Sequence, residues 1–149
     1  NACIDYYHKL PLGLEASGGL RYLHFTAEDV FIYTVYLGKY YKNLWFAYRP
    51  YVVNKSNSFF VSHTGIIRNY FSDIDNYISI NLIYGITPYT TNTFQDISRI
   101  GSQRIGFDAQ LKLYKSFLIK PMFIYEYEEF FPSLFRNRFY FQLTLLKRF

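Results

Sequence analysis

The feature that most constrains this sequence is a regular alternation of apolar and polar side chains over long stretches. Between residues 101 and 114, most positions of one alternating set are apolar and most positions of the other are polar or charged. The apolar set contains Ile105, Phe107, Ala109, Leu111 and Leu113, and the other set contains Ser102, Arg104, Asp108, Gln110 and Lys112. Successive side chains of a β-strand point to opposite faces, so a period of two predicts a strand with one apolar and one polar face.

The same scan along the whole chain predicts eight strands with no helix between them. The predicted strands span residues 12–25, 29–38, 43–54, 58–71, 75–87, 99–115, 117–130 and 136–149. The connections between them are short, the longest being residues 88–98, and short connections join antiparallel neighbours. The predicted fold is all-β, an antiparallel up-and-down barrel domain over residues 12–149, with residues 1–11 as an N-terminal lead-in.

The length of these strands indicates a membrane protein. Soluble sheets use strands of about five or six residues, whereas a tilted strand needs about 9 to 11 residues to cross a bilayer. In water the apolar face would need a covering layer, which a chain without helices lacks, but in lipid it needs none. Backbone groups inside a bilayer must all be paired, so the sheet is expected to close into a transmembrane β-barrel.

The end of the chain carries a second membrane signal. An alternating apolar run precedes the final residue Phe149, and Lys147 departs from that run. The run contains Phe139, Phe141, Leu143 and Leu145. It resembles the C-terminal strand signal that outer-membrane β-barrels present to their insertion machinery. The resemblance implies a location in the bacterial outer membrane, with membrane lipid and the barrel insertion machinery as partners.

Several short motifs resemble one family of barrels more specifically. They are Arg68-Asn69-Tyr70-Phe71-Ser72-Asp73, then Asp75-Asn76-Tyr77, and then Tyr84-Gly85-Ile86-Thr87-Pro88, with Tyr48-Arg49-Pro50-Tyr51 compatible. These motifs resemble the YaiO family of bacterial outer-membrane barrels. Some members of that family lie beside polysaccharide machinery, so the resemblance implies an anchor or accessory subunit that works with other envelope proteins or polysaccharide. It transfers no catalytic residue onto this sequence.

The number of strands in the complete barrel stays open at this point. The barrel of the YaiO family extends further at its N-terminus than this chain does. Either residues before Asn1 complete a larger barrel, or this protein closes with about eight strands. A barrel of about eight strands is filled by its own side chains, whereas a larger one can leave an open lumen.

The polar faces predict an internal cluster of charges. Antiparallel pairing about Ser116 places Arg104 opposite Glu126 or Glu128, and pairing about residues 131–135 places Arg138 beside the same carboxylates. The structural interpretation of this cluster is charge neutralisation in an enclosed interior, and the functional interpretation is a lumenal binding or constriction site. Four other charged residues are predicted to face the lumen: Arg49, Arg68, Asp108 and Lys112.

The residues favour neither catalysis nor a metal site. Two carboxylates on one strand could perform acid–base chemistry, but neighbouring arginines would keep both ionised, so we expect no enzyme. The three histidines, His8, His24 and His63, share no ligand spacing with each other or with Cys3, so neither a metal ion nor any other cofactor is predicted.

The composition raises two other classes of binding function. The net charge of +5 permits an acidic partner, but a soluble nucleic-acid binder would place aromatic and basic residues on one face, and this chain separates them. No nucleic-acid partner is therefore expected. The alternative to an anchor is a porin-like channel for small solutes, which requires more strands than the sequence shows.

Overall fold

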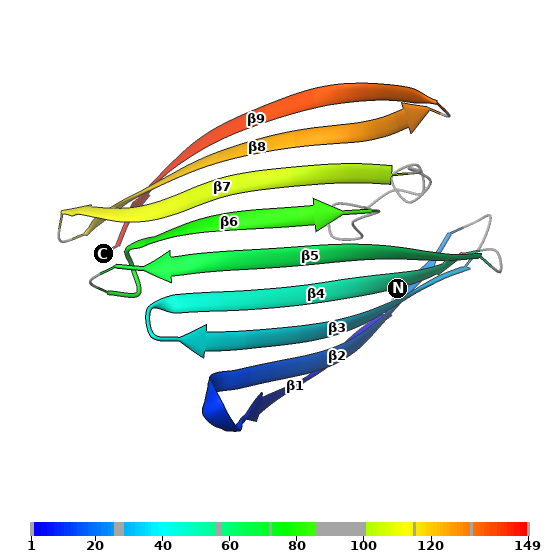
Figure 1. Ribbon diagram of the computed structural model, residues 1–149, viewed down its shortest axis with the longest axis horizontal. Helices are drawn as coiled ribbons and strands as arrows, with labels where there is room; N and C mark the ends of the chain where they lie inside the picture. The colour runs from blue at the N-terminus through cyan, green and yellow to red at the C-terminus, as the bar shows by residue number, and fades with distance from the viewer. Residues whose placement is uncertain are drawn as a thin grey trace.

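A computed structural model describes residues 2–25, 29–55, 58–71, 73–85, 101–114, 116–131 and 133–148. These residues form one antiparallel sheet of nine strands, each paired with the next along the chain (Figure 1). The strands are β1 (Ala2–Leu10), β2 (Leu14–His24), β3 (Asp29–Tyr41), β4 (Leu44–Lys55), β5 (Ser58–Tyr70), β6 (Tyr77–Tyr84), β7 (Gly101–Tyr114), β8 (Phe117–Phe131) and β9 (Leu134–Lys147). Within the described ranges, no helix has the length and apolar character needed to span a membrane.

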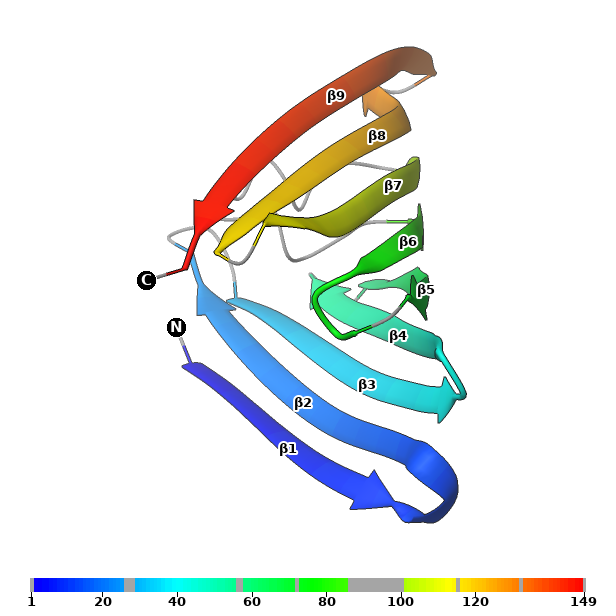
Figure 2. The same ribbon diagram turned by 90° about the vertical axis from the view of Figure 1, so that its left-hand side faces the viewer.

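The sheet is strongly curved, with β1 and β9 at its two edges (Figure 2). We call its concave side the inner face and its convex side the outer face. One hydrogen-bonded row of the outer face crosses five strands and consists of Ile67, Ile80, Phe107, Phe123 and Phe141. Their exposed fractions lie between 38% and 74%. Such a surface is unfavourable in water and suits contact with acyl chains.

The inner face is mostly polar, and it carries an apolar patch on β3 and β4. Val30, Ile32, Tyr51 and Val53 are buried against each other, and Leu23 packs against them from β2. The residues between them on β3, such as Phe31 and Tyr33, are exposed on the outer face. Both faces of β3 are therefore apolar at this end, and the sheet fills part of its concave side with its own side chains.

The N-terminal segment differs from the predicted lead-in. Ala2–Leu10 is a strand that pairs with β2 along its whole length. A single 3-10 turn, η1 (Pro11–Gly13), reverses the chain between them. It does so with positive φ angles of 62° at Leu12 and 70° at Gly13. Leu is an unusual residue for that conformation, so this turn lacks the usual composition of a hairpin signal.

Three further expectations about the sheet have different outcomes. Closure was expected, but β1 and β9 do not pair with each other within the described residues, so the described sheet is open. The predicted long connection at 88–98 lies outside the described residues. The eight predicted strands all exist, with ends that differ by up to three residues from the predicted ones.

Candidate functional site

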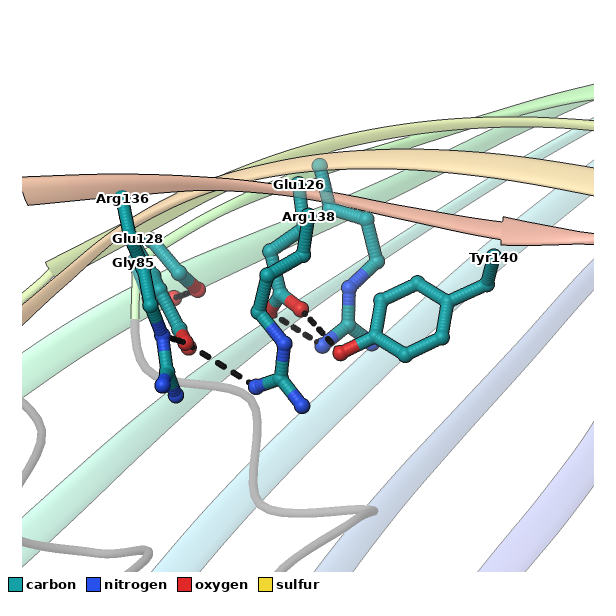
Figure 3. A network of polar contacts seen from close by, with 8 residues as sticks. Gly85, Glu126, Glu128, Arg136, Arg138 and Tyr140 are labelled. Atoms are coloured by element: carbon teal, nitrogen blue, oxygen red, sulfur yellow. Dashed lines mark hydrogen bonds and ion pairs between the residues drawn. The ribbon is translucent and has the colours of Figure 1, made fainter.

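The predicted charge cluster lies on the inner face of β7, β8 and β9 (Figure 3). The period of two places Glu126 and Glu128 on the same face of β8. The register then pairs Arg104 of β7 with Glu126, and Glu126 with Arg138 of β9. It also pairs Glu128 with Arg136. Three guanidinium groups thus surround two carboxylates, and we call these five residues the arginine–glutamate cluster.

Each carboxylate accepts hydrogen bonds from at least two side chains. Arg104 Nη2 donates to Glu126 Oε1 at 2.5 Å, and Tyr140 Oη donates to Glu126 Oε2 at 3.1 Å. Arg138 Nη1 donates to Glu128 Oε1 at 2.9 Å, and Arg136 Nε donates to the same oxygen. The two glutamates are 1% and 0% exposed. Burying a carboxylate is strongly unfavourable unless it is paired, and both have charged partners here.

The structure therefore brings together all four residues of the predicted cluster and adds two that the sequence reasoning missed. Arg136 lies two residues before Arg138, on the same face of β9, and Tyr140 lies two residues after it. Both follow from the same alternation. Arg136 was missed because the predicted strand began at that position, whereas β9 begins at Leu134.

The other predicted inner-face charges lie apart from the cluster. Asp108 accepts hydrogen bonds from Ser79 Oγ at 2.7 Å and from Asn81 Nδ2 at 2.6 Å. The backbone N–H of Lys112 donates to a side chain of the turn after β5, and the Lys112 side chain is exposed. Arg49 and Arg68 lie on β4 and β5, against aromatic rings.

The predicted insertion signal lies on the outer face of β9. Phe141, Leu143 and Leu145 are all exposed there, with exposed fractions above 50%. Phe149 lies outside the described residues. The apolar side chains of the last strand therefore project from the convex side, where lipid would contact them.

A second ion pair links the turn after β5 to the residue after β9. Arg148 donates from Nη1 to Asp75 Oδ2 at 2.7 Å and from Nη2 to Asp75 Oδ1 at 2.8 Å. These hydrogen bonds hold the pKa of the Asp75 carboxyl below its usual value. They also raise the pKa of Arg148. The backbone N–H of Arg148 donates to the carbonyl of Ser116 at 2.8 Å, so three separate turns and ends meet here.

Metal binding finds no support in the geometry. In the part of the chain that the structure describes, no group of three or more His, Cys, Asp or Glu side chains is placed to hold a metal ion. The side chains that do converge are arginines and glutamates in near balance. Their arrangement neutralises charge within the cluster.

Comparison with known proteins identifies the family. No similar curated protein and no similar solved structure was found. The family model described as the YaiO membrane beta barrel domain matches residues 1–90, which is more than half of the chain. That match covers β1 to β6, including the inner-face residues Arg49 and Arg68. With its antiparallel sheet, its apolar convex face and its charged concave face, the chain belongs to the YaiO membrane beta barrel family.

Proposed function

We propose that this membrane β-barrel protein is a non-enzymatic component of the bacterial outer membrane. In this role it is an anchor or accessory subunit of an envelope assembly, with polysaccharide machinery as the class of assembly it serves. The observation that carries the proposal is the arginine–glutamate cluster, in which the most deeply buried charges of the inner face are already paired with each other. A side-chain network of this kind stabilises the sheet of the barrel and involves no substrate.

The same cluster argues against acid–base catalysis. A pair of catalytic carboxylates needs different protonation states, which enzymes obtain by giving the two groups different surroundings. Here Glu126 and Glu128 have similar surroundings, because each is buried and each accepts from at least one guanidinium group. The two carboxylates therefore lack the difference in surroundings that such a catalytic pair requires.

The apolar cluster on β3 and β4 argues against an open channel. Val30, Ile32 and Val53 occupy concave surface that an aqueous pore would line with polar groups. Small barrels are filled by their own side chains in this way. The competing function, a porin-like channel, would require an unobstructed path along the inner face.

Three measurements test the proposal. Fractionation of cells that express a tagged full-length protein is expected to place it in the outer membrane, and recovery in the inner membrane would contradict the location. Purified protein in planar bilayers is expected to show no conductance steps, and stable steps would favour the channel. Affinity purification from solubilised envelopes is expected to recover partner proteins in fixed ratio, and purification of the barrel alone would contradict the accessory role.

A further inference from the structure

The outer face carries a groove that extends over strands β4 to β8. Its volume is about 460 Å³, which lies within the range of roughly 300–1,000 Å³ found for ligand sites. One hydrogen-bonded row of residues crosses the groove, and it consists of Tyr48, Gly65, Leu82, Ile105 and Tyr125. This row lies directly beside the exposed apolar row that begins at Ile67. The groove is therefore part of the surface that faces lipid.

Gly65 makes room in the groove between two larger side chains. Its cross-strand neighbours are Tyr48 and Leu82. An added Cβ at Gly65 would meet no atom within 4 Å, whereas one at Gly38 would collide with the ring of Tyr36. Glycine inside a strand weakens the sheet, and it often marks a place where a ligand approaches the backbone closely. The open space above Gly65 fits that second role.

A polar pair lies at one end of the groove. His63 lies two residues before Gly65 on the same face of β5, and its Nδ1 is 2.7 Å from the hydroxyl oxygen of Tyr48. The two rings are nearly parallel, with an angle of 13° between their planes. Polar groups that face lipid are unfavourable unless they are hydrogen-bonded. A histidine at this position therefore needs a partner for each ring nitrogen.

The hydrogen bond with Tyr48 determines which atom of His63 is left for a ligand. Among the described residues the Tyr48 hydroxyl has Nδ1 of His63 as its acceptor, so the hydroxyl donates to that nitrogen. A neutral imidazole that accepts at Nδ1 carries its proton on Nε2. In the part of the chain that the structure describes, no acceptor is hydrogen-bonded to Nε2. The groove thus presents one N–H donor at the end of an apolar channel.

The lining of the groove favours a lipid chain over a charged or peptide ligand. Its one permanently charged residue among the described ones is Arg104, whose guanidinium group is bound to Glu126 on the inner face. A peptide would bring N–H and C=O groups at every residue, and each would need a partner within the bilayer. An acyl chain brings no polar atom until its ester carbonyl. That single acceptor matches the single donor on His63.

We propose that this groove binds a membrane phospholipid, with one acyl chain lying against Gly65 and the ester carbonyl of that chain accepting a hydrogen bond from His63 Nε2. The groove recognises the chain and its ester, and it selects no head-group charge. The site assigns one defined lipid position on the outer face of the barrel. It uses none of the residues of the arginine–glutamate cluster, and it does not depend on the accessory role proposed above.

Two lipids that differ only in the carbonyl groups test the role of the ester. Folded full-length protein in detergent micelles is titrated with a diester phosphatidylethanolamine and with its diether analogue of the same chain length. Native mass spectrometry counts the lipid that stays bound. We expect one diester lipid to bind saturably and about fivefold more tightly than the diether, which is the effect of about one neutral hydrogen bond. Equal affinities, or no saturable binding, would overturn the proposal.

Filling the groove tests its position. Gly65→Leu places a side chain in the open space and is expected to weaken binding of the diester lipid at least about tenfold, the effect of about two methylene groups that lose their apolar contact. The matched control is Gly18→Leu on the outer face of β2, where an added Cβ also meets no atom within 4 Å. We expect the control to bind as the unmodified protein does. Equal losses in both variants would refute the site.

A second variant covers the case in which Gly65→Leu does not fold. The double variant Tyr48→Phe/His63→Phe keeps both rings and removes their polar atoms. We expect it to bind the diester and the diether lipid equally, with the affinity that the unmodified protein has for the diether. A retained preference for the diester would contradict the role of His63. A stable dimer that binds no lipid would also overturn the proposal, because a second copy of the chain would then occupy the groove.

Discussion

Replacement of Glu128 by Gln tests whether the arginine–glutamate cluster stabilises the barrel. Gln has nearly the same shape as Glu, so the change removes the charge without creating a cavity. The Glu128 side chain is fully buried and accepts from Arg136 and Arg138. Removing one partner of a buried ion pair costs about 3–5 kcal/mol, and hydrogen bonds to a charged group contribute about 1.5–3 kcal/mol each.

Hydration of the arginines reduces the loss of stability expected at the cluster. The side chains of Arg136 and Arg138 are 43% and 33% exposed, so water can hydrate both guanidinium groups once the carboxylate is gone. We therefore expect Glu128→Gln to lower the free energy of unfolding by about 2–4 kcal/mol. A loss of about 3 kcal/mol corresponds to a change of roughly 150-fold in the unfolding equilibrium constant.

The measurement is urea unfolding of the lipid-reconstituted protein, followed by Trp45 fluorescence and by the heat-dependent shift of the folded band on a gel. The matched control is Glu129→Gln, the same change one residue further along β8. Glu129 lies on the other face and accepts from the backbone N–H of Ser133 at 2.7 Å, which an amide oxygen can replace. We expect the control to lose less than about 1 kcal/mol.

The reasoning would be refuted by equal stabilities of the two variants. It would also be refuted by a Glu128→Gln variant more stable than the unmodified protein, because the buried charges would then be a net cost. The double variant Glu126→Gln/Glu128→Gln adds a further check. Since the two carboxylates share Arg138 as a near neighbour, we expect its loss to differ from the sum of the single losses.

Three other predictions concern the ends, the outer face and one turn of the sheet. Asp75→Asn should lower the unfolding temperature above about pH 5. Arg148 lowers the pKa of Asp75 from its usual 3.8, so the ion pair stabilises the unmodified protein above that pH. This stabilisation is lost as the pH falls through the lowered pKa. The unfolding temperatures of the two proteins should therefore become equal in acid. Phe107→Lys should destabilise the lipid-inserted protein by about 2–4 kcal/mol in urea unfolding, while Phe107→Leu should not. Gly85→Ala should lower the free energy of unfolding by about 1–3 kcal/mol, because Gly85 has a φ of 97° and an added Cβ would meet the Val61 carbonyl at 2.7 Å. The control is Gly65→Ala, where an added Cβ meets no atom within 4 Å, and it should be nearly neutral in the same assay.

The period of two was sufficient to predict most of the sheet and its two faces. Because each short connection limits the register of its hairpin, the sequence also placed Arg104 opposite Glu126 or Glu128, and the structure pairs it with Glu126. The predictions were weakest where one of these rules did not apply. Strand β1 was missed because Leu12 occupies a turn position that usually requires Gly or Asn.

Contacts between residues far apart in the sequence could not be predicted from alternation and short connections. The contact between Asp75 and Arg148 joins residues 73 positions apart, and it depends on the curvature of the sheet and on the path of a turn. The apolar patch formed by Val30, Ile32 and Val53 was also missed, because β3 is apolar on both sides and alternation cannot assign its faces. The register of a hairpin depends on its own connection, whereas these features depend on the curvature of the whole sheet.

Within the described residues the sheet has nine strands, and this number limits how its two edges, β1 and β9, can pair. In an up-and-down order of nine, the first and last strands run the same way. A ring in which all neighbours run in opposite directions contains an even number of members, so β1 meeting β9 directly would form a parallel seam. Two copies in the same membrane orientation would form two such seams. If an odd number of further strands lies between β9 and β1, every neighbouring pair in the ring is antiparallel. This holds whether the same chain or another one supplies those strands.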